Sequence, residues 1–322
     1  MKLDDARSYL DVFGSSPTAE EVESIYRRLS LVAHPDMGGS DELFVKLSEF
    51  KHRAIYLLLQ GRYGVDYHVE FATKKTKYGV VEILVENPLW QLCLVESDDG
   101  LTIARISNAP TSNALLEREA KNTKSFDSRF ALKVQDAAII DGRRVNVFAA
   151  PPGTDRLVPV SRILESYPSG WIALDTVWII RRLLVGLSAA HEAGVVCAGV
   201  VPSGVLIDPV DHGVILSDWC QSTGDKVVTA AYGHRDWYPS EVVAKQRVSV
   251  ATDLYMVARM FDYLSPSKVE PLTSFVKGCM MDSMASRPSS AADMLADLDN
   301  LLERLGDPYY PRRFRESPLL TK

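Results

Sequence analysis

The sequence predicts an α+β chain in which an N-terminal α-helical hairpin precedes a small β-rich lobe and a large helical lobe. Apolar residues recur at helical spacing through the first sixty residues. Short β-type runs then occupy residues 79–150, and helical patterns dominate the rest of the chain. A length of 322 residues, 46% of them hydrophobic, allows two or three domains with their own cores.

The hairpin is predicted from its helix boundaries. A first short helix ends where glycine, two serines and proline occupy residues 14–17. Thr18 and Glu21 have the spacing of a capping box, which predicts a second helix running to about Ala33. Ser40 precedes two acidic residues and an apolar stripe, so it is the expected N-cap of a third helix.

The tripeptide His34-Pro35-Asp36 lies between these two helices. Proline restricts its own backbone and that of the preceding residue, so we expect an exposed, polar and stiff hairpin tip. The stretch IYRRLSLVAHPDMGGSDELFVKLSEF resembles the J-domain pattern of tyrosine, basic pair, leucine, His-Pro-Asp and a following helix with phenylalanine. Residues 1–61 are therefore expected to form a J domain.

This resemblance implies a partner. In J domains the His-Pro-Asp loop engages a DnaK-type chaperone of the heat-shock seventy class and stimulates its ATPase. If these roles carry over to this chain, His34, Pro35 and Asp36 would stimulate the ATPase of the chaperone. Arg27 and Arg28 would make electrostatic contacts with the chaperone. The chain departs from the pattern because methionine follows Asp36 where lysine is usual. Acidic residues also outnumber basic ones here, so electrostatic steering should be weak.

The β-rich lobe follows a mixed, polar segment at residues 62–78, interpreted as a linker with at most one strand. Within residues 79–150, four β-type runs are separated by one helical segment, SNALLEREAKNTKSF, between the third and the fourth; the runs are VVEIL, WQLCLV, LTIARI and VNVFAA. A small sheet with one helix is expected.

The large lobe is assigned to residues 151–306. A helix is expected from about Leu174 to Glu192, then the strands VLID and VILSDW, and helices from Glu241 onward. Residues 307–322 form a tail that interleaves aromatic and arginine side chains. Packing against the lobe is the favoured interpretation of the tail, with RNA or an acidic peptide as alternatives.

This order of a strand-rich and a helical lobe resembles the protein-kinase fold. LTIARI resembles the strand of the phosphate-binding lysine, with Arg105 in its place, and LEREA supplies Glu119 as the partner glutamate. LSDWC retains Asp218 at the metal-binding position. In AAHEAGVVCAGVVPSGVLID, however, Gly199 and Gly204 replace the catalytic aspartate and the asparagine. Further downstream, Glu241, Asp253 and Arg287 also match positions of the protein-kinase pattern.

The resemblance implies a pseudokinase, and we predict that the chain is not an enzyme. The segment ENPLWQLCLVES lacks the glycines of a phosphate-covering loop. The tripeptide His234-Arg235-Asp236 has the letters of a kinase catalytic loop, but it follows Asp218 and is interpreted as a coincidence. We expect no cofactor and no metal, with ATP and magnesium as the ligands to test.

Composition excludes further classes. A net charge of −6 and a pI near 5.6 argue against general nucleic-acid binding. The longest apolar stretch, residues 171–187, contains charges and is too short for a membrane span. The four cysteines have no metal-binding spacing, and no secretory signal is present, so a cytoplasmic protein with reduced thiols is expected.

These observations favour a J-domain co-chaperone or recruitment protein whose kinase-like region binds an unidentified client. The first alternative is an atypical Ser/Thr protein kinase that binds ATP and is targeted by its J domain. The second is a non-catalytic scaffold without chaperone contact.

Overall fold

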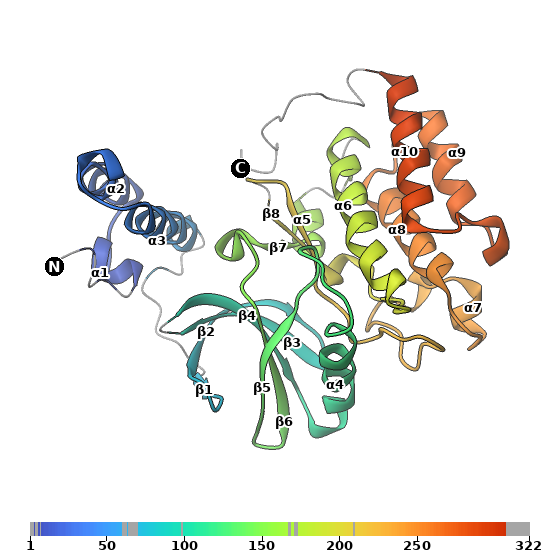
Figure 1. Ribbon diagram of the computed structural model, residues 1–322, viewed down its shortest axis with the longest axis horizontal. Coiled ribbons are helices and arrows are strands. Elements are labelled where there is room, and N and C mark those ends of the chain that lie inside the picture. Colours follow the sequence, from blue (N-terminus) through green and yellow to red (C-terminus); the bar gives the residue numbers. More distant parts are fainter. Residues whose placement is uncertain are drawn as a thin grey trace. The chain divides into compact units, whose positions relative to one another are not determined.

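The computed structural model describes residues 3, 6, 8–59, 63, 70–97, 99–166, 169–170, 173–208 and 210–306 (Figure 1). The chain divides into two compact units. The first contains residues 1–71, 76–81 and 96–101, and the second contains the remainder. The predicted tail at 307–322, and residues 62 and 64–69 of the predicted linker, lie outside the described residues.

The N-terminal unit contains a hairpin of α2 (Ala19–Ala33) and α3 (Asp41–Leu59), preceded by the short α1 (Tyr9–Phe13). The helix α2 begins with the expected capping box: the Thr18 side chain accepts from Glu21 N–H at 3.2 Å, and the Glu21 carboxylate accepts from Thr18 N–H at 2.7 Å. The hairpin has its own core, formed by Tyr9, Phe13, Val22, Ala33, Leu47, Ala54 and Leu57.

The tip between α2 and α3 contains a short helical turn, which the sequence pattern did not predict. A single 3₁₀ turn, η2 (Pro35–Met37), follows α2. The carbonyl of His34 accepts from Met37 N–H at 3.0 Å and from Gly39 N–H at 3.1 Å, which closes the turn. Proline therefore begins a new, tighter turn here and does not simply end the helix.

The larger sheet has six strands in the order β1-β2-β3-β4-β6-β5. Their bounds are β1 (Glu70–Ala72), β2 (Lys77–Glu86), β3 (Trp90–Ser97), β4 (Gly100–Ser107), β5 (Val134–Ile140) and β6 (Arg143–Phe148). One helix, α4 (Asn113–Asn122), follows the 3₁₀ turn η3 (Pro110–Ser112) and packs against β6. The expected strands and single helix are present, and β5 is an additional strand.

The prediction omitted β5 because this strand contains no fully buried residue. Its side chains alternate between exposed and half-buried positions, and it lies at the edge of the sheet beside β6 only. Such a strand has a weaker apolar signal than a central one.

The helical part is built around α6 (Ala173–Glu192), which packs against α8 (Val250–Leu264) and α10 (Ala291–Leu305). The remaining helices of this part are α5 (Val160–Ser166), α7 (Ser240–Val243) and α9 (Glu270–Cys279); Figure 1 shows α9 beside α10. A three-stranded antiparallel sheet joins β7 (Val158–Pro159), β8 (Val205–Asp208) and β9 (Gly213–Leu216). The 3₁₀ turns are η4 (Thr154–Arg156), η5 (Pro202–Gly204), η6 (Arg235–Trp237) and η7 (Met284–Ser286).

Two buried polar contacts tie this region together. Arg287 donates to both carboxylate oxygens of Glu241, at 2.7 and 3.1 Å. Thr252 donates to Glu241 as well, at 2.9 Å.

None of the helices in the described part of the chain combines the length and apolar character that crossing a bilayer requires.

Candidate functional site

A buried cluster of three charged side chains joins β4, α4 and the segment after β9. Arg105 Nε lies 3.1 Å from Glu119 Oε1, and Arg105 Nη1 lies 3.7 Å from Asp218 Oδ1. Arg105 Nη2 also donates to the carbonyl of Ser217 at 2.6 Å. The structure thus brings together three residues that the sequence places up to 113 positions apart, and all three are buried.

Two further side chains enclose this cluster. The ring of Trp90, the first residue of β3, lies over the guanidinium group of Arg105 at 3.9 Å from its centroid. Asn146 of β6 donates to Glu119 Oε2 at 3.0 Å and to the carbonyl of Leu116 at 2.8 Å. The second carboxylate oxygen of Glu119 is therefore paired, and its first faces Arg105.

Burial dominates the electrostatics of this cluster. Removal from water raises the pKa of Glu119 to about 7, against the opposing effects of Arg105 and Asn146. The same desolvation raises the pKa of Asp218, although Arg105 and the Cys220 N–H favour its charged form. The two carboxylates in turn raise the pKa of Arg105 above its ordinary value, so it stays charged.

The segment that resembles a catalytic loop is held by Asp253 of α8. Its carboxylate accepts from the backbone N–H groups of Cys197 and Ala198, each at 2.7 Å, and lies 2.9 Å from His191 Nε2. Tyr238 donates its hydroxyl to the carbonyl of Ala198 at 2.6 Å. Buried polar groups of Asp253 and Tyr238 therefore hold the backbone of this loop in place.

Gly199 and Gly204 allow this loop to press against the backbone of Asp218. A Cβ atom at position 199 would lie 2.0 Å from the Asp218 carbonyl oxygen. A Cβ atom at position 204 would lie 2.3 Å from the Gly199 carbonyl oxygen. The Gly204 carbonyl also accepts from Ser217 N–H at 2.8 Å. These positions supply close packing, and they carry no carboxylate or amide.

A polar pair between η5 and the start of η6 is not predicted from the sequence. Ser203 Oγ and His234 Nε2 lie 3.2 Å apart, within hydrogen-bond distance. His234 is half-buried, and its burial lowers its pKa despite the nearby Asp236 and Asp218. The tripeptide beginning at His234 was dismissed because it follows Asp218 in the chain. The contact between His234, at the start of η6, and Ser203 of η5 depends on tertiary packing that no local sequence pattern encodes.

The described residues do not form a magnesium cage. No group of three or more histidine, cysteine, aspartate or glutamate side chains with metal-binding geometry occurs among them. Asp218 supplies one buried carboxylate with Arg105 beside it, and Gly204 supplies no second ligand. These residues do not fit a dedicated metal site, so no chemical step below is assigned to a metal.

The predicted chaperone-binding residues lie on the separate hairpin. His34 and Pro35 are exposed, and the His34 ring packs edge-on against Phe44 at 5.4 Å. Arg27 and Arg28 are exposed on α2. They help line a surface hollow of about 800 Å³ with Ala19, Glu20, Glu23, Ser24, Leu31 and Ile55. The side chain of Asp36 lies outside the described part of the structure.

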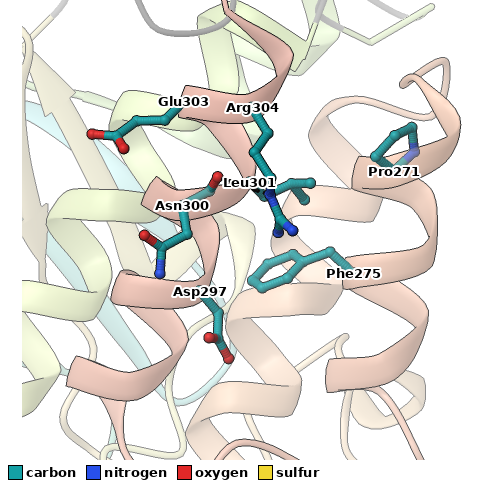
Figure 2. A pocket seen from close by; sticks show the side chains of 7 residues that line it. All are labelled: Pro271, Phe275, Asp297, Asn300, Leu301, Glu303 and Arg304. Carbon is teal, nitrogen blue, oxygen red and sulfur yellow. Dashed lines mark hydrogen bonds between the residues drawn. The ribbon is translucent and has the colours of Figure 1, made fainter.

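A groove on the helical part lies between α9 and α10 and has a volume of about 760 Å³. Figure 2 shows Phe275 of α9 and Arg304 of α10 pointing toward one another within it. The other lining residues are Pro271, Asp297, Asn300, Leu301 and Glu303. The groove shares no residue with the Arg105 cluster.

The comparisons with known proteins define the class first: the second unit has the bilobal, kinase-like α+β fold. The kinase domain of PknI from Mycobacterium tuberculosis is similar over 70% of this chain and 95% of that chain, with a TM-score of 0.53 and 16% identity. A single-substitution and a double-substitution variant of that domain give TM-scores of 0.54 and 0.55. No protein-family model matches the sequence, and no curated protein is similar enough to match.

These likenesses confirm the kinase-like fold and correct one prediction. The solved structures that share the fold are kinase domains, which contradicts the prediction that this chain is not an enzyme. That prediction relied on the side chains missing at Gly199 and Gly204. It did not foresee Ser203 and His234, which the fold brings within 3.2 Å of each other. These likenesses do not test the J-domain resemblance of the N-terminal hairpin, which stays a prediction.

Proposed function

We propose that the kinase-like unit is an atypical Ser/Thr protein kinase that binds a nucleoside triphosphate beside Arg105 and transfers its terminal phosphoryl group to a hydroxyl. The observation that carries this proposal is the ion pair between Arg105 and Glu119, with Asp218 next to it. In phosphoryl transfer, catalysis consists mainly of positioning and of charge stabilisation by groups of this kind. A guanidinium group binds phosphate oxygens well and stays charged at every physiological pH.

Access to Arg105 requires a movement of Trp90. In the structure Arg105 has no exposed surface, because the indole ring covers its guanidinium group. A triphosphate must therefore displace this ring before its oxygens can reach the arginine. Binding is expected to be weak in the wild-type chain, since the cation–π contact is lost in the process.

We assign the proton-accepting role to His234. The position of the usual catalytic aspartate is Gly199, which has no side chain. His234 lies at the start of η6 and reaches this loop, within hydrogen-bond distance of the Ser203 hydroxyl. Its lowered pKa leaves the imidazole neutral near pH 7, as a general base requires. The acceptor oxygen would bond to phosphorus as its proton passes to Nε2 and the nucleoside diphosphate leaves.

Two measurements test this proposal. The melting temperature of the full chain should rise with nucleoside triphosphate and magnesium, and more so in Trp90→Leu, where the cover is smaller. Transfer of labelled phosphate to the chain or to a general protein substrate should fall about a hundredfold or more in His234→Gln. Arg235→Gln, an exposed neighbour, is the matched control. Absence of both a thermal shift and any transfer in the wild type would refute the proposal.

A second function is favoured by the exposed hairpin tip. We propose that His34, Pro35 and Asp36 recruit a DnaK-type chaperone in the cytoplasm and stimulate its ATPase, while the kinase-like unit holds the client or substrate. The 3₁₀ turn supports this, because a preformed tip lowers the ordering cost of docking. Stimulation of chaperone ATPase by the full chain should be lost in His34→Gln and kept in Glu42→Gln. Equal, unstimulated rates for all three chains would exclude this function.

A further inference from the structure

Two arginines share the ring of Phe130 on the second unit, apart from the residues assigned above. Arg129 places its guanidinium carbon 4.8 Å from the ring centroid, and Arg182 of α6 places its own at 5.8 Å. Both positive groups therefore lie near one ring. Like charges that act on one another are stabilised when an anion compensates them.

Backbone contacts fix the position of Phe130. The Phe130 carbonyl accepts from Leu216 N–H at 2.7 Å, and Leu132 N–H donates to the Leu216 carbonyl at 3.3 Å. On the other side, Phe130 sits against α6 at Gly186, where an added Cβ atom would lie 2.8 Å from Phe130 Cβ. Gly186 is one helical turn after Arg182, so this close approach brings the arginine to the ring.

The positive charge here is not compensated within the described residues. Arg181, the neighbour of Arg182, pairs with Asp299 at 2.9 Å. Neither Arg129 nor Arg182 has an acidic partner in the part of the chain that the structure describes. Burial and the nearby Arg129 and Arg181 lower the pKa of Arg182 below its ordinary value. A pair of like charges without an acidic partner disfavours the unliganded state.

We propose that Arg129 and Arg182, held on the ring of Phe130, form a binding site for a doubly charged oxyanion of the phosphoryl class. Two guanidinium groups offer several N–H donors, which suit the several oxygens of a phosphoryl group better than a single carboxylate. The aromatic ring keeps both groups in place without neutralising them. This site is independent of the proposed phosphoryl transfer at Arg105.

Calorimetric titration of the full chain tests the site, with inorganic phosphate, acetate and a phosphoserine peptide as probes at matched ionic strength. The wild type should bind phosphate, and Arg182→Gln and Arg129→Gln should bind it at least about tenfold more weakly. Arg143→Gln removes an exposed arginine from β6 and should bind as the wild type does. If the phosphoserine peptide binds more tightly than phosphate, the natural ligand is a phosphorylated protein. If the two bind equally, the natural ligand is a small anion.

The stability of the unliganded variants provides a second readout. Because Arg182 carries an uncompensated charge, Arg182→Gln should melt at or above the temperature of the wild type, and phosphate should no longer raise it. The site would be excluded by phosphate binding that persists unchanged in Arg182→Gln, by equal binding of acetate, or by a wild type that binds no phosphate. A marked fall in the melting temperature of Arg182→Gln would likewise contradict an uncompensated charge.

Discussion

The ring of Trp90 covers the guanidinium group of Arg105, at 3.9 Å from the ring centroid to the guanidinium carbon. A local turn fixes this contact, because Asn87 accepts from Leu89 N–H at 2.8 Å and from Trp90 N–H at 3.1 Å. The turn therefore sets the start of β3 and the position of the indole. One residue at a strand end thus covers the guanidinium group of the charged cluster.

Arg105→Met is expected to destabilise the kinase-like unit by about 3 to 5 kcal/mol, because it leaves two buried carboxylates without their cation. Urea unfolding of the full chain measures this change. Arg143→Met, at an exposed position, should change the free energy of unfolding by about 0.5 kcal/mol or less. Adding Glu119→Gln to Arg105→Met should recover part of the loss, since one unpaired charge is removed. Additive effects of the two substitutions would contradict their coupling.

The raised pKa of Glu119 predicts a pH dependence. Between its ordinary value of 4.5 and about 7, the folded state holds more protons at this carboxyl than the unfolded state does. Its contribution to stability is therefore complete below pH 4.5 and is lost as the pH rises through 7, at up to about 1.4 kcal/mol per pH unit. Glu119→Gln removes this titration. The difference in melting temperature between the wild type and this variant should shift in favour of the variant from pH 5 to pH 8, and a constant difference would contradict the raised pKa.

Local chemistry made much of the fold predictable. The capping box of Thr18 and Glu21 predicts the start of α2, because its hydrogen bonds join residues that are close in the sequence. The resemblance to the protein-kinase fold implied the pairing of Arg105 with Glu119, and the structure brings the two side chains within 3.1 Å. The edge strand β5 was missed because its side chains are only half-buried.

The parts of the site that could not be predicted depend on contacts between distant segments. Trp90 begins a strand, and its apolar character gives no sign that it will cover an arginine of β4. Ser203 and His234 are 31 residues apart and meet only through the packing of η5 and η6. The glycines at 199 and 204 were interpreted as missing side chains, whereas their role in close backbone packing appears only in three dimensions.

Thr18→Ala should destabilise the N-terminal hairpin by about 1 kcal/mol, because the Glu21 N–H loses its acceptor at the start of α2. Hydrogen exchange of the α2 amides in the full chain measures this local stability. Thr18→Ser keeps the hydroxyl and should retain most of the protection. Equal exchange in the alanine variant and the wild type would mean that α2 is held by its packing against α3 alone.

Gly199→Ala is expected to destabilise the kinase-like unit by about 1 to 3 kcal/mol, because its Cβ would meet the Asp218 carbonyl oxygen at 2.0 Å and the backbone must shift. Gly278→Ala is the matched control: no atom lies within 4 Å of the added methyl in α9, so stability should stay equal or rise by up to about 1 kcal/mol. Gly199→Asp restores the carboxylate of a usual kinase but meets the same backbone. It should therefore lower the midpoint of urea unfolding at least as much as alanine does and should not increase phosphate transfer. A stable, more active Gly199→Asp chain would show that this loop can move away from Asp218.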